Sequence, residues 1–392
     1  MRTHFLSGPA ASFAPSRRAR NGGFTLVELM VGLLLGMLTV LVISQVLAMS
    51  EGKKRSIATG SNAMVNGALA LYTLQRELQM AGYGLAYKPE ALGCPLQGTF
   101  TAPGTPAVSE TFTGTLAPVI ITDGGTDGSP DTLTLLQSRK ASYAVPVMVN
   151  SQSTTYYTVL SSLGTQAGDL MVAVPSAWNA TTPCRLFNAT DDGAGSPSNT
   201  GLWALRVPHT ESTTTTSWNN NTTLALSPAS YLLNLGSLGY STFSINSSTQ
   251  ALQTTTRTAT AASSTSELFP QIVNLQAMYG KDTNSDGVVD TYNNVTPANN
   301  AEWRQVLTIR IAVVARSTQY EKSKADESDA VTQTAPLWDL GASSTVTGAA
   351  ACHSGSKCVA LKIDQVPDWK HYRYKVYDTI VPLRNILWNT AS

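Results

Sequence analysis

Charged side chains are scarce in this chain. Asp, Glu, Lys and Arg make up 13% of its 392 residues, against roughly 25% in ordinary globular proteins. Serine, threonine, asparagine and glycine must therefore supply most of the polar surface, which suits a secreted, strand-rich protein better than a cytosolic enzyme. The net charge of +1 becomes −3 without the four arginines that precede Asn21. The chain without these arginines lacks the excess of Lys and Arg that binds nucleic acid, so we expect no direct nucleic-acid partner.

Catalytic motifs are also missing. None of the four histidines accompanies a Gly-x-Ser-x-Gly elbow, a His-Glu-x-x-His motif or a phosphate-binding loop. His4 lies in the amino-terminal leader, and we expect His209, His353 and His371 to be surface or structural residues. The sequence therefore predicts a protein that is not an enzyme.

Proline is absent between Pro15 and Pro89, whereas 17 of the 19 prolines lie from Pro89 onward. Because proline interrupts helices, this gap predicts one long helix from Phe24 to about Ala81, followed by a loop- and strand-rich body. The helix would be roughly 85 Å long. Its first half is apolar on all sides and long enough to span a bilayer. Its second half is amphipathic, and the stripe expected to pack on the protein's own sheet is Met64, Leu71, Leu74 and Leu78.

One acidic residue interrupts the apolar half of this helix. A basic leader ends in Gly22-Gly23, Phe24 follows, and Glu28 is the only charged residue between positions 24 and 50. An isolated charge in hydrocarbon is costly and is normally retained for a function. In a chain that begins at Phe24, the new amine would lie about one helical turn from Glu28. In a packed array of such helices, we expect Glu28 to neutralise the amine of the next subunit.

The segment Gly-Phe-Thr-Leu-Val-Glu at residues 23–28 resembles the type III leader of type IV prepilins and pseudopilins. The resemblance implies that prepilin peptidase cuts between Gly23 and Phe24, and that Phe24 is then N-methylated. The leader arginines favour a cytoplasmic amino terminus, which places the chain after about Ser50 in the periplasm. The alternative is an ordinary signal peptide cut after Ser50. It would release a soluble secreted binding protein starting at Glu51 and would leave Glu28 unexplained.

All four cysteines follow the hydrophobic segment, where an oxidising periplasm would find them. The short spacing of Cys352 and Cys358 favours a disulfide that closes a local loop, which would leave Cys94 to pair with Cys184. Four cysteines allow three pairings, and the sequence does not decide among them. A zinc site is the alternative, with His353 and His371 near the Cys352/Cys358 pair, although the spacing matches no zinc knuckle.

Alternating apolar and polar residues predict strands at 305–316 and 372–381, with weaker signals at 133–136 and 171–174. Residues 271–279 fit a helical or a strand period. We predict a strand there because two alternating runs follow. The Ser-, Thr- and Asn-rich stretch 210–266 is predicted to form long loops between short strands. The expected fold class is α+β, with the long helix packed on a mainly antiparallel sheet.

An Asp-rich segment has the ligand spacing of a calcium loop. Side-chain oxygens stand at positions 1, 3, 5 and 9, glycine stands at position 6, and a main-chain carbonyl would serve at position 7. These ligands would be Asp282, Asn284, Asp286, Asp290 and the carbonyl of Val288. The twelfth position is Asn293, so the usual bidentate glutamate is missing. Weak calcium binding is one interpretation, and an Asx-rich turn between two strands is the other.

Several later segments resemble the PilW family of minor pilins in type IV pilus assembly. They are Gly82-Tyr83-Gly84, Tyr231–Gly236, Val273–Tyr279 and Val381–Asn385. The resemblance implies a pilin-like fold. It suggests a leader (1–23), a long helix (24–82) with residues 24–50 in the membrane or filament core, and a globular domain (83–392). That domain would divide into parts 83–265 and 266–392.

The function implied by the resemblance is a place in the priming or tip complex that initiates pilus assembly and supports the tip adhesin. The expected partners are other minor pilins, the major pilin, the adhesin, prepilin peptidase and the inner membrane. The protein would cross the inner membrane once, with a periplasmic carboxyl-terminal domain, and would then join the pilus tip. The alternative family member is the J-type minor pseudopilin of type II secretion, which shares the leader and the sheet.

Overall fold

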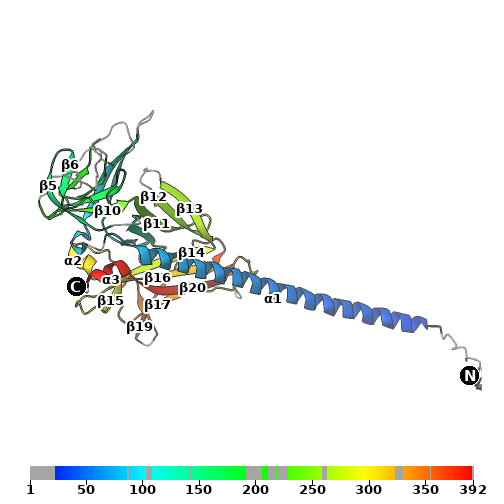
Figure 1. The fold of residues 1–392 in the computed structure, drawn as a ribbon. Coiled ribbons are helices and arrows are strands. Elements are labelled where there is room, and N and C mark those ends of the chain that lie inside the picture. Colours follow the sequence, from blue (N-terminus) through cyan, green and yellow to red (C-terminus); the bar gives the residue numbers. More distant parts are fainter. Residues whose placement is uncertain are drawn as a thin grey trace, which may run out of the picture. The chain divides into compact units, whose positions relative to one another are not determined.

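The predicted long helix is present. The computed structural model describes residues 23–85, 88–102, 108–140, 144–190, 205–210, 217–218, 226, 228–257, 263–322, 330–353 and 355–390. The chain divides into two compact units, residues 1–57 and 58–392. Helix α1 (Leu26–Met80) begins in the first unit and ends in the second (Figure 1). The absence of proline between positions 15 and 89 therefore located the helix correctly.

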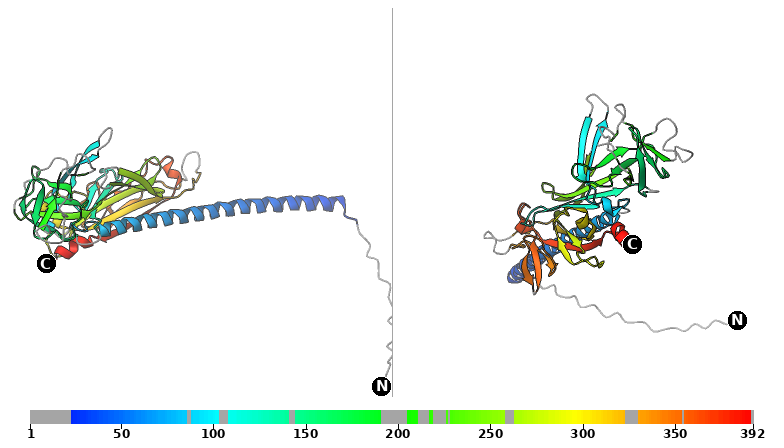
Figure 2. Two further views of the ribbon diagram at one scale, coloured as in Figure 1. Left: turned by 45° about the horizontal axis from the view of Figure 1, so that its top comes forward. Right: turned by 90° about the vertical axis from the view of Figure 1, so that its left-hand side faces the viewer.

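The strands of residues 58–392 form four sheets (Figures 1 and 2). The largest is an eight-stranded sheet with the order β2-β1-β8-β7-β10-β5-β6-β9. Its strands are β2 (Val108–Thr115), β1 (Pro95–Ala102), β8 (Cys184–Asn188), β7 (Leu170–Val174), β10 (Tyr231–Gly236), β5 (Val147–Gln152), β6 (Tyr156–Val159) and β9 (Arg206–Pro208). Neighbouring strands are antiparallel except for the parallel pair β1–β8.

The other three sheets are antiparallel throughout. The five-stranded sheet contains β13 (Ser263–Pro270), β12 (Ala251–Arg257), β11 (Leu238–Asn246), β4 (Thr132–Ser138) and β3 (Val119–Thr122). The four-stranded sheet contains β15 (Thr291–Asn293), β14 (Ile272–Lys281), β16 (Val306–Arg316) and β20 (Tyr374–Pro382). The three-stranded sheet contains β17 (Leu337–Gly341), β19 (Ser356–Ala360) and β18 (Ala350–His353). The expected α+β class with a mainly antiparallel sheet is confirmed.

Short helices lie before, between and after the strands. They are η1 (Pro89–Ala91), α2 (Asn300–Arg304), η3 (Trp369–His371) and α3 (Arg384–Thr390). The strands predicted at 271–279, 305–316 and 372–381 correspond to β14, β16 and β20, and the weaker signals fall in β4 and β7. All ten residues of β14 are buried, which explains why its sequence fitted both periods.

The prediction of long loops over residues 210–266 was wrong for much of the described part of this stretch. β10, β11 and β12 lie within it, and β13 begins there. Threonine is β-branched and suits a pleated surface, and the hydroxyl groups pair across the strands instead of remaining in loops. Thr134 lies 3.2 Å from Thr242, and Thr255 lies 2.8 Å from Thr265. Residues 211–216, 219–225, 227 and 258–262 lie outside the described residues.

A bend in one continuous stretch of chain joins two sheets. β10 belongs to the eight-stranded sheet and β11 to the five-stranded sheet, and only Ser237 separates them. Gly236 has a φ of +65°, and a Cβ there would lie 3.1 Å from backbone atoms of Lys140. Only glycine combines this left-handed conformation with such a close approach. The bend therefore depends on Gly236.

The expected division at residue 265 does not appear in the structure. Residues 58–392 form one compact unit. A single hydrophobic cluster contains Leu74 and Leu78 of α1, Leu133 and Phe243 of the five-stranded sheet, and Ile309 of the four-stranded sheet. Because strands from both proposed parts bury their apolar faces in the same core, the parts 83–265 and 266–392 are not separate.

The buried stripe of α1 differs from the predicted one. Leu74 and Leu78 are fully buried and Leu71 is partly buried, as expected, but Met64 is 51% exposed. Small residues take its place, namely Ala63, Gly67 and Ala70. A Cβ on Gly67 would overlap the ring of Tyr377 in β20. The helix thus lies too close to the sheet for a large side chain there.

We predict that Gly67→Leu destabilises the protein by about 1 to 3 kcal/mol, because the added side chain must displace Tyr377. The matched control is Ala68→Leu, on the neighbouring exposed position of the same helix, which should change stability by less than about 0.5 kcal/mol. Urea unfolding followed by circular dichroism measures both. Equal effects for the two variants would contradict the close approach.

Candidate functional site

The amino-terminal helix begins immediately after the predicted cleavage point. α1 starts at Leu26, and Thr25 closes its first turn. The Thr25 hydroxyl accepts a hydrogen bond from the Glu28 backbone N–H (3.3 Å), and the Thr25 carbonyl accepts one from Leu29 N–H (3.1 Å). Glu28 lies in this first turn, where a negative charge complements the helix dipole. Gly23, Phe24 and Glu28 are all exposed.

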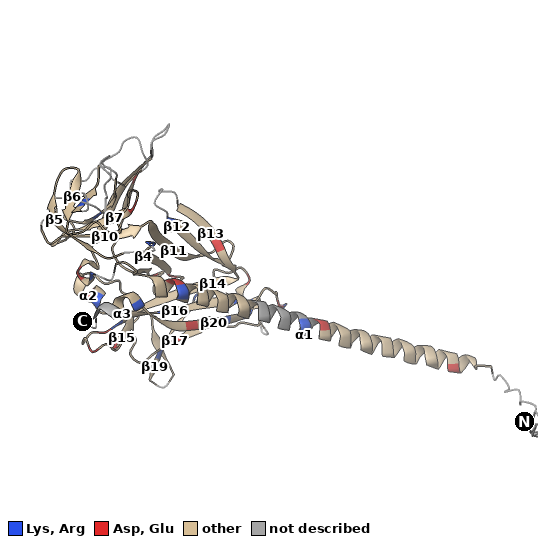
Figure 3. Ribbon diagram, viewed as in Figure 1, with Lys and Arg blue, Asp and Glu red and all other residues tan. Residues whose placement is uncertain are grey.

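The apolar half of α1 has its surface uncovered in the single chain. Residues Leu26–Glu51 have a mean hydropathy of 2.6 and are long and apolar enough to cross a membrane. The large hydrophobic side chains from Leu26 to Met49 are between 49% and 76% exposed. In Figure 3 this half of the helix carries one acidic residue near its amino-terminal end. Such a surface requires lipid or other apolar helices around it.

Two hydroxyl side chains within this half form hydrogen bonds inside the helix. The Thr39 hydroxyl donates to the Gly36 carbonyl and the Ser44 hydroxyl donates to the Leu41 carbonyl, each at 2.8 Å. Such bonds let hydroxyl groups enter hydrocarbon at little cost. A carboxylate cannot be satisfied in this way because it can only accept hydrogen bonds. Glu28, the only charged residue between positions 24 and 50, therefore needs a cationic or donor partner from outside its own turn.

Two of the segments quoted above for the family resemblance meet at the end of α1. Gly82 and Gly84 have φ angles of +76° and +79°, and the turn they form is bonded to β4 through Gly82 N–H and the Leu136 carbonyl (2.9 Å). The Asn385 amide donates to the carbonyls of Met80 (3.2 Å) and Ala81 (3.0 Å). The Met80 carbonyl also accepts a hydrogen bond from the Tyr83 N–H (3.2 Å), and Asn385 adds a side-chain donor for the carbonyls at this end of the helix. In the sequence, Asn385 was recognisable only as part of the segment Val381–Asn385 that resembles the PilW family.

Both expected disulfides are present. Cys94 pairs with Cys184, and Cys352 pairs with Cys358. The second bond closes the β18–β19 hairpin, where ligand atoms of Cys352, His353 and Cys358 lie within 4.8 Å of one another. Because both sulfur atoms are in the disulfide, no thiolate is left to bind a metal. The His371 ring is elsewhere, stacked on Tyr320 with centroids 4.4 Å apart. The zinc alternative is not supported.

The Asp-rich loop brings three of its five predicted ligand residues, Asn284, Asp286 and Asp290, into contact. The Asp282 carboxylate is buried and accepts hydrogen bonds from backbone N–H groups of Ser285 (2.6 Å) and Gly287 (2.7 Å). The Asn284 amide donates to Asp286 (3.2 Å) and Asp290 (3.3 Å). Hydrogen bonds from Thr283 lower the pKa of Asp290 and keep it ionised. Val288, whose carbonyl was the fifth predicted ligand, is exposed. These bonds suit an Asx-rich turn as well as a metal loop, so calcium binding stays a prediction.

A second acidic turn, between β3 and β4, packs against β14. Asp131 is 1% exposed, and its carboxylate accepts hydrogen bonds from the N–H groups of Gly124 (2.9 Å) and Ala277 (2.8 Å). Burial nevertheless raises the pKa of Asp131 to about 7. Asp127 is exposed, and its ion pair with Lys362 lowers its pKa to about 2. The acidic turn is therefore a structural attachment of the β3–β4 hairpin to β14.

Comparison with known protein families gives two matches. The family described as Type IV Pilus-assembly protein W matches residues 241–385, and the prokaryotic N-terminal methylation motif matches residues 18–44. The second match contains Gly23, Phe24 and Glu28. The chain is similar to PilW-type pilins over these residues. The PilW match runs from within β11 into α3 and includes the whole of the four-stranded sheet, whereas the eight-stranded sheet lies outside both matches. Pilins are structural proteins.

Other comparisons add little to this family assignment. No curated protein matches this PilW-like chain. Among solved structures, one match is a type IV-like pilin from Thermus thermophilus. The alignment covers 82% of this chain and 97% of that pilin, at 9% sequence identity and a TM-score of 0.30. That is a weak overall match.

We predict that the Asp-rich loop binds calcium weakly, because three of its ligand side chains are already in contact while the twelfth ligand is missing. Isothermal titration of protein lacking residues 1–50 should give heat at millimolar calcium, and the melting temperature should rise. Asp286→Asn should abolish both effects, while Asp364→Asn, an acidic residue outside the loop, should change neither. Absence of heat and of any melting shift in the unaltered protein would contradict calcium binding.

We predict that Asp131 makes the protein less stable as pH rises. An acid whose pKa is raised in the folded state binds more protons than it does unfolded, so stability falls between about pH 4 and pH 7, by roughly 2 to 4 kcal/mol. Asp131→Asn should flatten this part of the profile in urea titrations. Asp127→Asn is the contrast, because a lowered pKa contributes stability that is lost only as pH falls from about 4 toward 2. An unchanged profile in Asp131→Asn would refute the assignment.

Proposed function

We propose that this PilW-like pilin joins the priming or tip complex that starts type IV pilus assembly and supports the tip adhesin. Its partners are other minor pilins, the major pilin, the adhesin and prepilin peptidase. It spans the inner membrane once with a periplasmic carboxyl-terminal domain before it enters the pilus tip, and it acts as a structural subunit without enzymatic activity. The observation that carries the proposal is the exposed apolar half of α1, in which Glu28 is the only charged residue between positions 24 and 50.

Cleavage between Gly23 and Phe24 would make Glu28 the fifth residue of the mature chain. The new amine of Phe24 then stands about 6 Å along the helix from Glu28. Both charges enter an apolar bundle together, and removing one partner of a buried ion pair costs about 3 to 5 kcal/mol. A Glu28 that neutralises the amine of the neighbouring subunit gives the stacked helices a defined register. Apolar contacts alone would allow the helices to slide.

The second half of α1 supports the same role. The face opposite the buried stripe leaves large apolar side chains uncovered. Val65 is 52% exposed, Leu69 46% and Tyr72 64%. These side chains offer neighbouring helices a second contact above the membrane-spanning half. The match of residues 241–385 to the PilW family supports a pilus role over a J-type pseudopilin of type II secretion.

We expect Glu28→Ala to abolish incorporation into pili, because the neighbouring amine would be left unpaired in an apolar environment. Glu51→Ala is the matched control. It removes a carboxylate from the other end of the candidate membrane span and should leave incorporation near normal. Quantitative immunoblots of sheared pili measure both variants, with membrane levels of each protein as the reference. Normal piliation in Glu28→Ala would overturn the proposed role of Glu28.

Cleavage of the leader and methylation of Phe24 can be measured separately from incorporation into pili. Mass spectrometry of the mature protein should find N-methyl-Phe24 at the amino terminus. Gly23→Ala should leave the leader attached and block incorporation, with little effect on the melting temperature of the globular domain. A mature chain that starts at Glu51 would instead support an ordinary signal peptide.

A further inference from the structure

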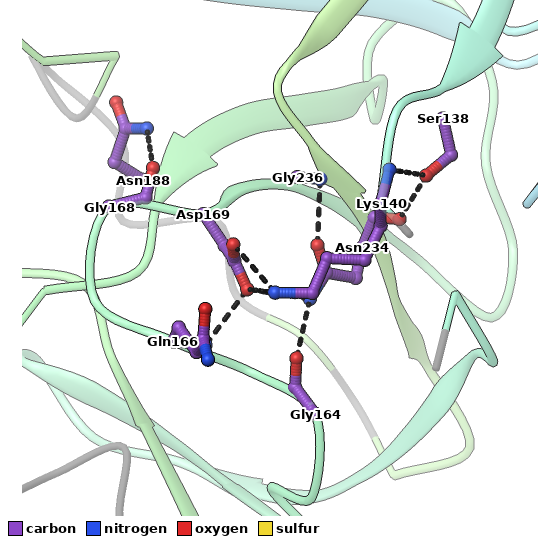
Figure 4. A network of polar contacts seen from close by, with 9 residues as sticks. All are labelled: Ser138, Lys140, Gly164, Gln166, Gly168, Asp169, Asn188, Asn234 and Gly236. Atoms are coloured by element: carbon purple, nitrogen blue, oxygen red, sulfur yellow. Dashed lines mark hydrogen bonds and ion pairs between the residues drawn. The ribbon is translucent and has the colours of Figure 1, made fainter. Parts of the chain in front are cut away.

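Three polar side chains converge in the interior where the eight-stranded and five-stranded sheets meet (Figure 4). Lys140 follows β4, Asp169 precedes β7, and Asn234 lies in β10. The side chains of Lys140 and Asp169 are 11% and 10% exposed, and Asn234 is 2% exposed. Asp169 is the only acidic residue between positions 132 and 190. An amine, a carboxylate and a primary amide are thus enclosed together.

The Asp169 carboxylate accepts hydrogen bonds from the side chains of both Lys140 and Asn234. Lys140 Nζ donates to Asp169 Oδ1 (2.9 Å) and Oδ2 (2.7 Å). Asn234 Nδ2 donates to the same Oδ2 at 2.9 Å. The lysine nitrogen and the asparagine amide therefore lie within two hydrogen-bond lengths of each other. The Gln166 N–H also donates to Oδ2 (2.8 Å) and fixes the carboxylate in place.

The Asn234 amide is held and polarised from its other side. Its Oδ1 accepts a hydrogen bond from the Gly236 N–H at 2.8 Å. The Ser138 hydroxyl donates to the backbone carbonyl of Asn234 (3.0 Å) and accepts from the backbone N–H of Lys140 (3.1 Å). These two bonds hold the backbone of Lys140 beside β10. A donor on the amide oxygen stabilises negative charge that develops there during attack on the amide carbon.

A buried ion pair usually brings little net stability, because desolvation of the two charges offsets their attraction. This cluster has a further capacity, since it contains a nucleophilic amine, an amide carbon whose oxygen has a donor, and a carboxylate that touches both nitrogens. We propose that Lys140 and Asn234 become joined by an intramolecular amide bond, with Asp169 moving the proton. This inference does not depend on the proposed function.

The step balances without an oxidant or a cofactor. Asp169 accepts a proton from the Lys140 ammonium group, and the neutral amine attacks Cγ of Asn234. The negative charge that forms on Oδ1 faces the Gly236 N–H. Asp169 returns the proton to Nδ2, the Cγ–Nδ2 bond breaks, and ammonia leaves and takes up the proton released by the lysine nitrogen. The products are a secondary amide and an ammonium ion, and Asp169 is unchanged.

The bond would join the end of β4 to β10 beside the bend at Gly236. It would fasten the eight-stranded sheet, which lies outside the matched family regions, to the five-stranded sheet. A covalent link of this kind constrains the unfolded chain as a disulfide does, but it would survive reduction.

The test is peptide mapping of the full-length protein purified from membranes, reduced and digested with trypsin. Trypsin should fail to cut after Lys140. Peptide 140–185 should appear joined to peptide 207–257, with a mass lower than their sum by one ammonia. Fragmentation should locate the link at Lys140 and Asn234.

Two variants separate the covalent bond from the ion pair. Lys140→Arg keeps the positive charge but lacks the amine, so it should give only linear peptides, cut after position 140. Asp169→Asn keeps the amine and the amide but lacks the carboxylate, and it should leave the pair unlinked in protein that is folded by circular dichroism. Only linear peptides from folded, unaltered protein would overturn the proposal, whatever the variants do.

Discussion

The structure depends on one helix that must be stable in two different environments. Up to Glu51, α1 exposes large apolar side chains on every side and requires lipid or other helices. From Ala63, the same helix buries a narrow stripe in the core of its own chain. A single α-helix can do both because its backbone hydrogen bonds are internal in either environment. The proposed pairing of Glu28 with a neighbour's amine adds a partner for the only charged side chain between positions 24 and 50.

The globular unit is organised around the buried stripe of α1. Small residues let the helix approach the four-stranded sheet closely, and Leu74 and Leu78 extend into the core shared with the five-stranded sheet. The Gly82–Gly84 turn ties the end of the helix to β4, while Asn385 caps its last carbonyls. The β10–β11 bend then connects this core to the eight-stranded sheet. A surface with few charges is compatible with this arrangement, because hydroxyl and amide groups hydrogen-bond across the strands.

Much of the fold followed from local patterns. Proline distribution located α1, and period-two alternation located β16 and β20. The leader motif alone indicated Gly23, Phe24 and Glu28, and the methylation-motif match covers all three. The prediction failed where composition was used in place of periodicity. Residues 210–266 were expected to form long loops between short strands because they are rich in Ser, Thr and Asn. Threonine packs well in strands, however, and β10 to β12 occupy most of residues 231–257.

The sequence by itself determined the length of the helix, its apolar first half, the lone Glu28 and the strongest strands, because backbone sterics and side-chain periodicity act along the chain. Only the tertiary structure decided which small residues of α1 face the sheet, how the cysteines pair, why Asp131 is buried, and that Lys140, Asp169 and Asn234 meet. These features join segments that are far apart in the sequence. They depend on how the sheets pack, and no local pattern records that packing.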